Sequence, residues 1–376
     1  MSSRAAKPIF VAEFEQEFAQ RLGARGAVAA GFGRAAMKLA LDAVGVAGGH
    51  VLVPELICTQ VTEAVRRAGA RPVFYPVERD LAIRGESLAA ALAPQTRAAV
   101  VVHYYGRVQP EMIALAALCR EREVACIEDC AMALGASLSG MPAGAFGDIG
   151  VFSFTKSDWC DGGGMVTAHR ADLARALDAA SAELKEHNRL SFRYGMLRRA
   201  DYVANRPRWS RVAEQAGRVL QRWCFPGVSD FYEAGRFDAA MPDFTARRAT
   251  RIVRGLAEAA QRRRGIVAAI RESLLPAAET ALFQGLFHGD DTGDSCAFLL
   301  LRCAGAAGEW VDYAARRGVT LRRMWPAYQE TEPGQDAARL AMWAEGIVFM
   351  EVSPHLTRRE VERISGVLGA LAPKGD

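Results

Sequence analysis

The chain has 376 residues, of which 51% are apolar and 24% are charged, and these values exclude a disordered or collagen-like protein. Its 47 basic and 43 acidic residues give a formal charge of +4, which is too balanced for a surface that binds nucleic acid or a membrane. No apolar run follows the first basic residues, and no uncharged stretch is long enough to span a bilayer. The eight cysteines form no C-x-x-C pair, so we expect a reducing cytoplasm.

The first half of the chain has the pattern of a parallel α/β protein. After a helical lead over residues 11–22, short runs rich in valine and isoleucine alternate with longer segments of helical period. The expected strands lie at residues 50–53, 71–75, 98–103, 124–128, 149–154 and 164–167, and the expected helices at residues 35–43, 59–68, 87–92 and 110–121. This alternation predicts βα units around a doubly wound sheet.

The rest of the chain reads as a connector followed by a smaller lobe. An irregular aromatic stretch over residues 192–232 is interpreted as a connector or a loop insertion. The later pattern predicts helices over residues 246–275 and 309–317, strands near 295–303, 319–321 and 346–352, and a final helix that Thr357 and Glu360 open with a capping box. We therefore expect a helical lead (1–24), a large α/β domain (25–240) and a smaller α+β domain (241–376).

Residues that directly follow strands are the first candidates for chemistry, because ligands of open parallel sheets bind beyond the carboxyl ends of the strands. Asp129 and Lys156 occupy such positions. Taken singly, the aspartate has the alternative role of a helix cap and the lysine that of a solvated surface residue. Together with Ser153 and the turn over residues 31–35, they suit a pyridine cofactor. The amine would hold its aldehyde, the carboxylate its protonated ring nitrogen, and the hydroxyl and backbone donors its phosphate.

A series of short motifs then follows one family in order and spacing. These are residues 33–54, Ala-Gly-Ala-Arg-Pro-Val-Phe at 68–74, Val-His-Tyr-Tyr-Gly at 102–106, Ile-Glu-Asp-Cys-Ala at 127–131, Gly-Asp-Ile-Gly-Val-Phe-Ser-Phe at 147–154 and Gly-Gly-Met-Val at 163–166. The series resembles the large domain of the DegT/DnrJ/EryC1/StrS family of fold-type I, pyridoxal-phosphate-dependent aminotransferases, many of which act on keto-sugars. The resemblance implies a large, mixed, mostly parallel sheet flanked by helices with a smaller α+β carboxyl-terminal domain. It also implies a homodimer with active sites at the subunit interface.

The resemblance assigns roles by position. Lys156 resembles the Schiff-base lysine, Asp129 the partner of the ring nitrogen and Ser153 a phosphate ligand, while Ala131 would pack on one face of the ring. Because Lys156 is a lysine, it argues against the dehydration chemistry of those relatives that carry histidine at this position.

Three positions depart from the family pattern. The Gly33-Arg34-Ala35 turn falls where the family often has a small hydroxyl residue, so Arg34 would bind the phosphate through its guanidinium, with a surface role as the alternative. Cys58 replaces an aromatic residue that often stacks on the cofactor. Met132 replaces a glutamine that contacts the ring hydroxyl, a contact that His103 or a backbone group would then supply.

Substrate contacts are expected in two places. One is the end of the strand over residues 98–103, and the other follows the late strand near residue 320. The candidates are His103, Tyr104, Tyr105, Arg322, Arg323 and Trp325. Packed aromatic rings and solvated arginines are the alternatives. No cysteine or histidine set has the spacing of a metal site, so we expect no metal.

These observations predict a pyridoxal-phosphate-dependent aminotransferase that moves an amino group from an amino acid to a keto or aldehyde acceptor, a keto-sugar or a natural-product intermediate. One alternative is a cofactor enzyme that performs elimination, decarboxylation or carbon-carbon chemistry. The other is a catalytically degenerate homologue that serves as a binding or scaffold protein, an alternative raised by Cys58 and Met132.

Overall fold

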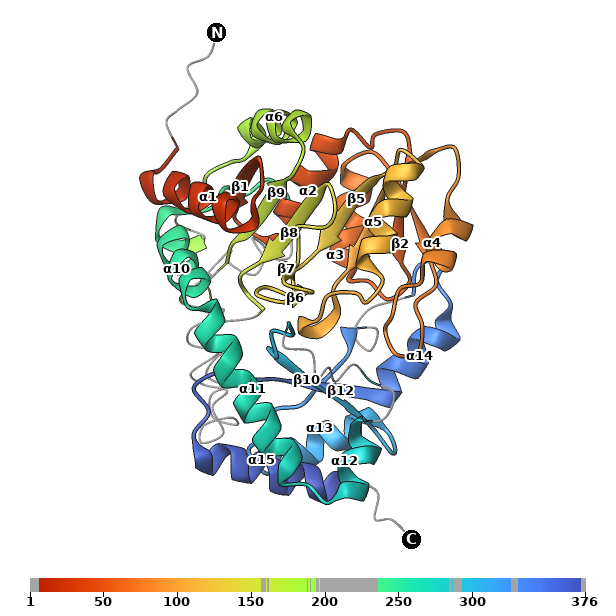
Figure 1. Ribbon diagram of the computed structural model, residues 1–376, viewed down its shortest axis with the longest axis vertical. Coiled ribbons are helices and arrows are strands. Elements are labelled where there is room, and N and C mark those ends of the chain that lie inside the picture. The colour runs from red at the N-terminus through yellow and green to blue at the C-terminus, as the bar shows by residue number, and fades with distance from the viewer. Residues whose placement is uncertain are drawn as a thin grey trace.

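The chain folds into two stacked lobes, a large one around a seven-stranded sheet and a smaller one around a three-stranded sheet (Figure 1). The structure is a computed structural model, and it describes residues 7–156, 160, 162–187, 189, 191–193, 196, 236–283, 286, 293–325 and 331–372. The aromatic stretch predicted as a connector lies mostly outside these described residues. None of the described helices is both long and apolar enough to span a bilayer.

The large sheet has the strand order β1-β9-β8-β5-β4-β2-β3. Its strands are β1 (Gly26–Ala30), β2 (His50–Pro54), β3 (Arg71–Tyr75), β4 (Thr96–Val102), β5 (Ala125–Asp129), β8 (Ile149–Ser153) and β9 (Gly164–Ala168). Neighbours from β3 to β8 run parallel, whereas β9 is antiparallel to both β8 and β1. The predicted mixed, mostly parallel sheet is therefore confirmed. Strand β1 was not predicted, because its alanine-rich sequence has little β propensity.

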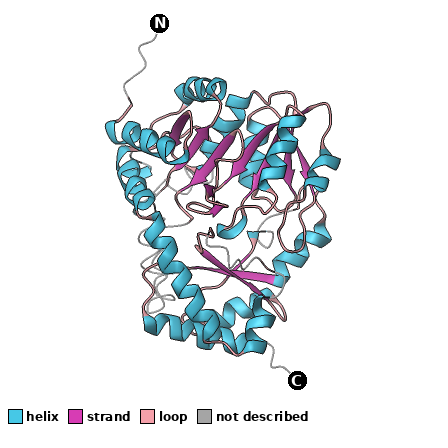
Figure 2. Ribbon diagram, viewed as in Figure 1, coloured by secondary structure: helices cyan, strands magenta, loops and turns pink. Residues whose placement is uncertain are grey.

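Helices cover both faces of this sheet (Figure 2). They are α1 (Ile9–Leu22), α2 (Gly33–Val44), α3 (Thr59–Arg67), α4 (Gly85–Ala91), α5 (Met112–Glu121), α6 (Ala171–Ala180) and α10 (Asp243–Arg254), with the short 3-10 turns η1 (Tyr104–Gly106) and η2 (Ser181–Glu183). Helices α1 and α2 end at Gly23 and Gly45, which adopt the left-handed conformation that glycine tolerates without strain.

Packing of α1 against the end of β8 sets the direction of the site residues. The rings of Phe14 and Phe18 contact those of Phe152 and Phe154, with centroids 4.9 Å apart for Phe18 and Phe152 and 5.3 Å apart for Phe14 and Phe154. Successive side chains of a strand point to opposite faces of its sheet. Burial of these two phenylalanines on the α1 side therefore turns Ser153, which lies between them, to the other face.

A small hairpin, β6 (Ser137–Leu138) and β7 (Met141–Pro142), follows β5 and was not predicted. Its turn residues Ser139 and Gly140 both have positive φ, as a tight hairpin turn requires. The hairpin points toward the small lobe (Figure 1), where the amide of Ser137 donates to the carbonyl of Gly293 at 2.7 Å. It therefore forms one of the contacts between the lobes.

The small lobe is an antiparallel sheet with helices packed on it. Its elements are α11 (Leu256–Glu272), α12 (Pro276–Phe283), β10 (Phe298–Arg302), α13 (Ala307–Ala315), β11 (Arg322–Arg323), α14 (Ala337–Gly346), β12 (Ile347–Glu351) and α15 (Arg358–Leu371). Along β10, Phe298 and Leu300 pack into the core of the large lobe, whereas Leu299 and Leu301 pack into a second core with α12, α13 and α15. Burial on both faces explains why β10 is an unbroken apolar run.

Two predicted elements differ in detail from the structure, and a third feature is confirmed. The single helix expected over residues 246–275 is divided into α10 and α11 at Gly255. The strand expected over residues 319–321 forms directly after them, as the two-residue β11. The capping box at Thr357 and Glu360 is confirmed. Buried residues of α10 join the core of the large lobe, and the domain boundary at residue 240 stays a prediction.

Candidate active site

The predicted chemical groups meet at one edge of the large sheet. Asp129 is the last residue of β5 and Ser153 the last residue of β8, and these two strands are parallel neighbours. Lys156 lies three residues beyond Ser153, in the turn that leaves β8, and is exposed. The sheet thus presents a carboxylate, a hydroxyl and an amine at the edge where ligands of such sheets bind.

Asp129 is held in a buried position with one oxygen open. Its side chain is 8% exposed, and its Oδ1 accepts a hydrogen bond from the amide of Ala131 at 3.0 Å, while its other oxygen has no partner among the described residues. Burial raises the pKa of Asp129, and the ammonium of Lys156 acts in the opposite direction. The lysine is therefore within electrostatic reach of this carboxylate.

Lys156 is also distinguished by what it does not contact. Lys7, Lys38 and Lys185 each form an ion pair, with Glu15, Asp42 and Asp238 respectively. Among the lysines that the structure describes, only Lys156 has neither an ion pair nor a hydrogen bond to another described residue. Its amine is thus available to a ligand.

The amino end of α2 forms a tight cradle beside Ser153. A Cβ added at Gly33 would lie 2.9 Å from the Cβ of Ser153, so only glycine fits there without a shift. No described side chain caps α2, and its first amides can bind an anion. The hydroxyls of Ser153 and Thr155 are 3.0 Å apart. Sequence reasoning did not assign a role to Thr155, although its place directly before the lysine was the available signal.

Arg34 and Ala35 occupy the first turn of α2. Ala35 is buried, whereas the guanidinium of Arg34 lies over the ring of Phe32 at 5.2 Å from its centroid and donates to Oε1 of Gln60 at 3.0 Å. Gln60 belongs to the first turn of α3, two residues after its N-cap residue Cys58. The first turns of α2 and α3 are thus linked, a contact that sequence reasoning did not find.

The residues beyond β5 include the two expected ring contacts. Ala131 is partly exposed and Met132 is buried at 6% exposure. Cys58, beyond β2, is a partly exposed free thiol. The structure leaves their predicted contacts with a cofactor ring as predictions.

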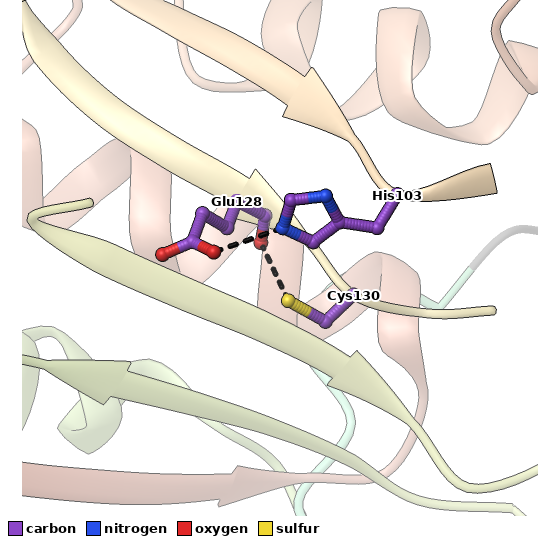
Figure 3. Close-up of side chains that lie close together, drawn as sticks. All are labelled: His103, Glu128 and Cys130. Carbon is purple, nitrogen blue, oxygen red and sulfur yellow. Dashed lines mark hydrogen bonds and ion pairs between the residues drawn. The ribbon is translucent and has the colours of Figure 1, made fainter. Parts of the chain in front are cut away.

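His103, predicted as a substrate or ring-hydroxyl contact, directly follows β4 and lies beside Asp129, whose backbone carbonyl accepts from its amide at 3.0 Å. It is fully buried, its Nε2 lies 2.8 Å from Oε2 of Glu128, and its Nδ1 accepts from the amide of Gln109 at 3.2 Å (Figure 3). Both ring nitrogens are therefore occupied, with the proton on Nε2 donated to the carboxylate. These contacts give His103 a structural role within the chain, and its contact with a substrate or with the ring hydroxyl stays a prediction.

Glu128 organises the loop that leads into β8. Besides His103, its carboxylate accepts from the amides of Gly144, Phe146 and Gly147 at 2.6 to 2.8 Å. Cys130 lies close to this pair (Figure 3), and burial raises the pKa of its thiol well above the ordinary value. A metal would need the thiolate form of Cys130 and free lone pairs on Glu128. The carboxylate of Glu128 instead accepts hydrogen bonds from backbone amides and from His103.

The aromatic candidates for substrate contact come together between the lobes. Trp325 stacks on Tyr105 with centroids 5.7 Å apart and an 18° angle, and on Tyr104 at 6.3 Å. Tyr104 is buried, and its hydroxyl donates to the carbonyl of Leu56 at 2.6 Å. Tyr105 has a φ of 50°, an unusual conformation for a tyrosine, and its buried hydroxyl has no partner among the described residues. These rings pack the junction of the lobes, and a substrate contact by any of them stays a prediction.

The two arginine candidates are engaged within the small lobe. Arg322 is exposed and lies 3.7 Å from Glu351, and Arg323 pairs with Glu345. The structure does not bring either guanidinium to Asp129 by any described contact. Their role toward a substrate therefore also stays a prediction.

Comparison with known proteins fits this geometry. The chain belongs to the DegT/DnrJ/EryC1/StrS aminotransferase family, which it matches over residues 6–199. It is 39% identical, over 43% of its own length and 45% of the relative's, to a UDP-N-acetyl-3-dehydro-alpha-D-glucosamine 3-aminotransferase of Acidithiobacillus ferrooxidans. It is 35% identical, over 60% of its length and 58% of the relative's, to a dTDP-3-amino-3,4,6-trideoxy-alpha-D-glucose transaminase of Micromonospora megalomicea. The chain spans about half the length of the curated relatives it matches.

Solved structures extend the likeness to the whole fold. The aminotransferase TlmJ from Streptoalloteichus hindustanus superposes with a TM-score of 0.71 at 26% identity, covering 96% of this chain and 90% of the other. A structure of DesI with its TDP-sugar product gives a TM-score of 0.73 at 23% identity, with 97% and 85% covered. The predicted family and the predicted fold class are thereby confirmed.

Proposed function

We propose that this protein is a pyridoxal-phosphate-dependent aminotransferase that uses Lys156 and Asp129. The observation that carries the proposal is the edge where an unpaired lysine, a buried carboxylate and an uncapped helix start lie together in a chain of this family. The curated relatives named above transfer amino groups to sugars. A structure of a relative from Streptococcus pneumoniae is described in a PLP form and a PMP form.

The residues at this edge fit the cofactor. The cradle at Gly33, which a Cβ would fill, together with the hydroxyls of Ser153 and Thr155, suits a phosphate. The open oxygen of Asp129 suits a protonated ring nitrogen. Arg34 lies beside the same turn and would add a charged phosphate contact, while Ala131, Met132 and Cys58 would line the ring.

Each residue then has a chemical role. When bound, pyridoxal phosphate supplies an electrophilic aldehyde and a ring that accepts electrons. Lys156 would hold the aldehyde of the cofactor through its amine and, once an amino donor had displaced it, would take up and return the proton at the donor's α-carbon. Asp129 keeps the ring nitrogen protonated, because its buried negative charge is stabilised by a cationic partner.

The acceptor is proposed as a keto group on a sugar or a cyclic polyol, by analogy with the names of the relatives. They include an L-glutamine:2-deoxy-scyllo-inosose aminotransferase of Streptomyces lividus, which is 38% identical over 45% of this chain and 41% of its own. The predicted homodimer and the predicted cytoplasmic location belong to this proposal.

The proposal is tested by absorbance with and without an amino donor. Wild-type protein incubated with pyridoxal phosphate should become yellow, and glutamate or glutamine should remove the yellow band while producing the pyridoxamine form. A band that persists with every amino donor, while carbon dioxide or an elimination product is released, would support the alternative enzyme. Protein that stays colourless would support the scaffold homologue.

A further inference from the structure

Side chains of the small lobe contact the large lobe on both sides of the start of α3, at Glu55 before it and at Thr62 and Arg66 within the helix. The contacts come from side chains that lie more than 260 residues apart in the sequence. We call this set the inter-lobe latch, and it consists of Glu55, Thr62 and Arg66 of the large lobe with Glu332, Gln335 and Arg339 of the small lobe.

One half of the latch holds the residue directly after β2. The side-chain amide of Gln335 donates to the backbone carbonyl of Glu55 at 2.7 Å, and Nη1 of Arg339 lies 3.1 Å from Oε1 of the same residue. This oxygen also accepts from the amide of Val77 at 3.0 Å. Glu55 is 4% exposed, so its charge depends on these partners.

The other half of the latch holds α3 itself. The hydroxyl of Thr62 lies 2.5 Å from Oε1 of Glu332, and Arg66 forms an ion pair with the same carboxylate. The amide of Glu332 in turn donates to Oε1 of Gln335 at 2.7 Å. Glu332 and Gln335 are therefore linked to each other, and the two halves form one connected set.

The segment between the two halves carries site residues. Cys58 is the N-cap of α3, and Gln60 binds the guanidinium of Arg34 at the start of α2. Both lie between Glu55 and Thr62, the large-lobe ends of the latch. A displacement of this segment would therefore move the expected ring contact and the partner of Arg34 together.

We propose that the inter-lobe latch positions the Cys58-to-Gln60 segment against the bound cofactor, so that seating of the small lobe sets cofactor affinity. This inference rests on the proposed function. Glu332 and Gln335 act as positioning residues, since they hold the segment without touching the cofactor. Replacing Glu332 or Gln335 leaves the buried charge of Glu55 paired, because Arg339 remains in place.

The test uses the full chain with Glu332→Ala and Gln335→Ala as the latch variants. The control is Glu63→Ala, which removes an ion pair with Arg67 on the same helix but breaks no contact with the described residues of the small lobe. Amide hydrogen exchange of the peptide over residues 55–62 is measured in ligand-free protein, and the dissociation constant of pyridoxal phosphate is measured by absorbance titration. Thermal midpoints report global stability.

Each latch variant should speed exchange in residues 55–62 and raise the dissociation constant roughly tenfold, with a thermal midpoint close to that of the control. Unchanged affinity despite faster exchange would overturn the positioning role, as would an equal loss of affinity in Glu63→Ala. Wild-type protein that binds no pyridoxal phosphate would overturn both this inference and the proposed function. If only the latch inference is wrong, wild-type protein still binds pyridoxal phosphate and the latch variants bind it equally well.

Discussion

The buried carboxyl of Asp129 lowers the stability of the ligand-free protein while suiting it to bind a cationic group. Burial raises the pKa of its carboxyl in the ligand-free protein. A carboxyl with a raised folded-state pKa favours the folded state only below its unfolded pKa of about 3.9, and that contribution is lost as the pH rises through the folded value. Above that folded value the ionised carboxylate therefore lowers the free energy of unfolding of the ligand-free protein.

Asp129→Asn should consequently raise the free energy of unfolding of the ligand-free protein at pH 7. The amide keeps an acceptor for the backbone of Ala131 and removes the buried charge. We expect a gain of roughly 0.5–2 kcal/mol, the range of single stabilising substitutions. Denaturant titration checks this, and the gain should shrink as the pH falls toward the unfolded pKa of aspartate. A variant that is less stable than wild type at pH 7, or one that retains amino transfer, would contradict this account.

At the residue scale, the sequence predicted the residues that follow strands. It missed contacts that depend on a hydrogen-bond partner elsewhere in the chain. Lys156, Asp129 and Ser153 could be found because parallel strands deliver their ends to one edge. The contact of His103 with Glu128 was missed. Glu128 points to the opposite face of the sheet from Asp129, because the two are consecutive in β5. That alternation was a usable signal.

At the scale of elements, the amino end of α2 is the most tightly packed piece of the site. Gly33→Ala would push a Cβ against Ser153 at the point where the phosphate is proposed to bind. Overpacking of this kind typically costs about 1–3 kcal/mol. We therefore expect the dissociation constant of pyridoxal phosphate to rise about tenfold or more, measured by absorbance titration.

Gly265→Ala in α11 is the matched control for this substitution. A Cβ there meets no atom within 4 Å, and alanine favours a helix interior more than glycine does by roughly 0.5–1 kcal/mol. The control should be slightly more stable than wild type and bind the cofactor equally well. An equal loss of affinity in both variants would remove the special role of the α2 cradle.

Element boundaries were predictable where local chemistry decides them. The capping box of α15 satisfies its own backbone through Thr357 and Glu360, so four residues of sequence suffice to find it. The division between α10 and α11 was not predicted, because buried residues up to Leu256 pack in the core of the large lobe, whereas Ile270 near the end of α11 packs in the second core. Amphipathic period alone does not reveal such a change of partner.

At the scale of the whole molecule, the two lobes pack together because strand β10 of the small-lobe sheet has apolar side chains on both faces. The run at β10 predicts burial on two sides, but the sequence does not say that one side is the large lobe. The contacts of Glu55 with Gln335 and Arg339 were equally invisible, because residues about 280 positions apart carry no shared local pattern. Packing of the lobes decides them.

The central claim is that Lys156 carries the cofactor, and borohydride reduction followed by peptide mapping tests it most directly. Wild-type protein loaded with pyridoxal phosphate should yield a pyridoxyl label on Lys156, and Lys156→Ala should remain folded, take no label and transfer no amino group. Lys185→Ala, in which a paired surface lysine is lost, should label as wild type does. A label on Lys185 or Lys38 of the wild-type protein, with none on Lys156, would contradict the assignment.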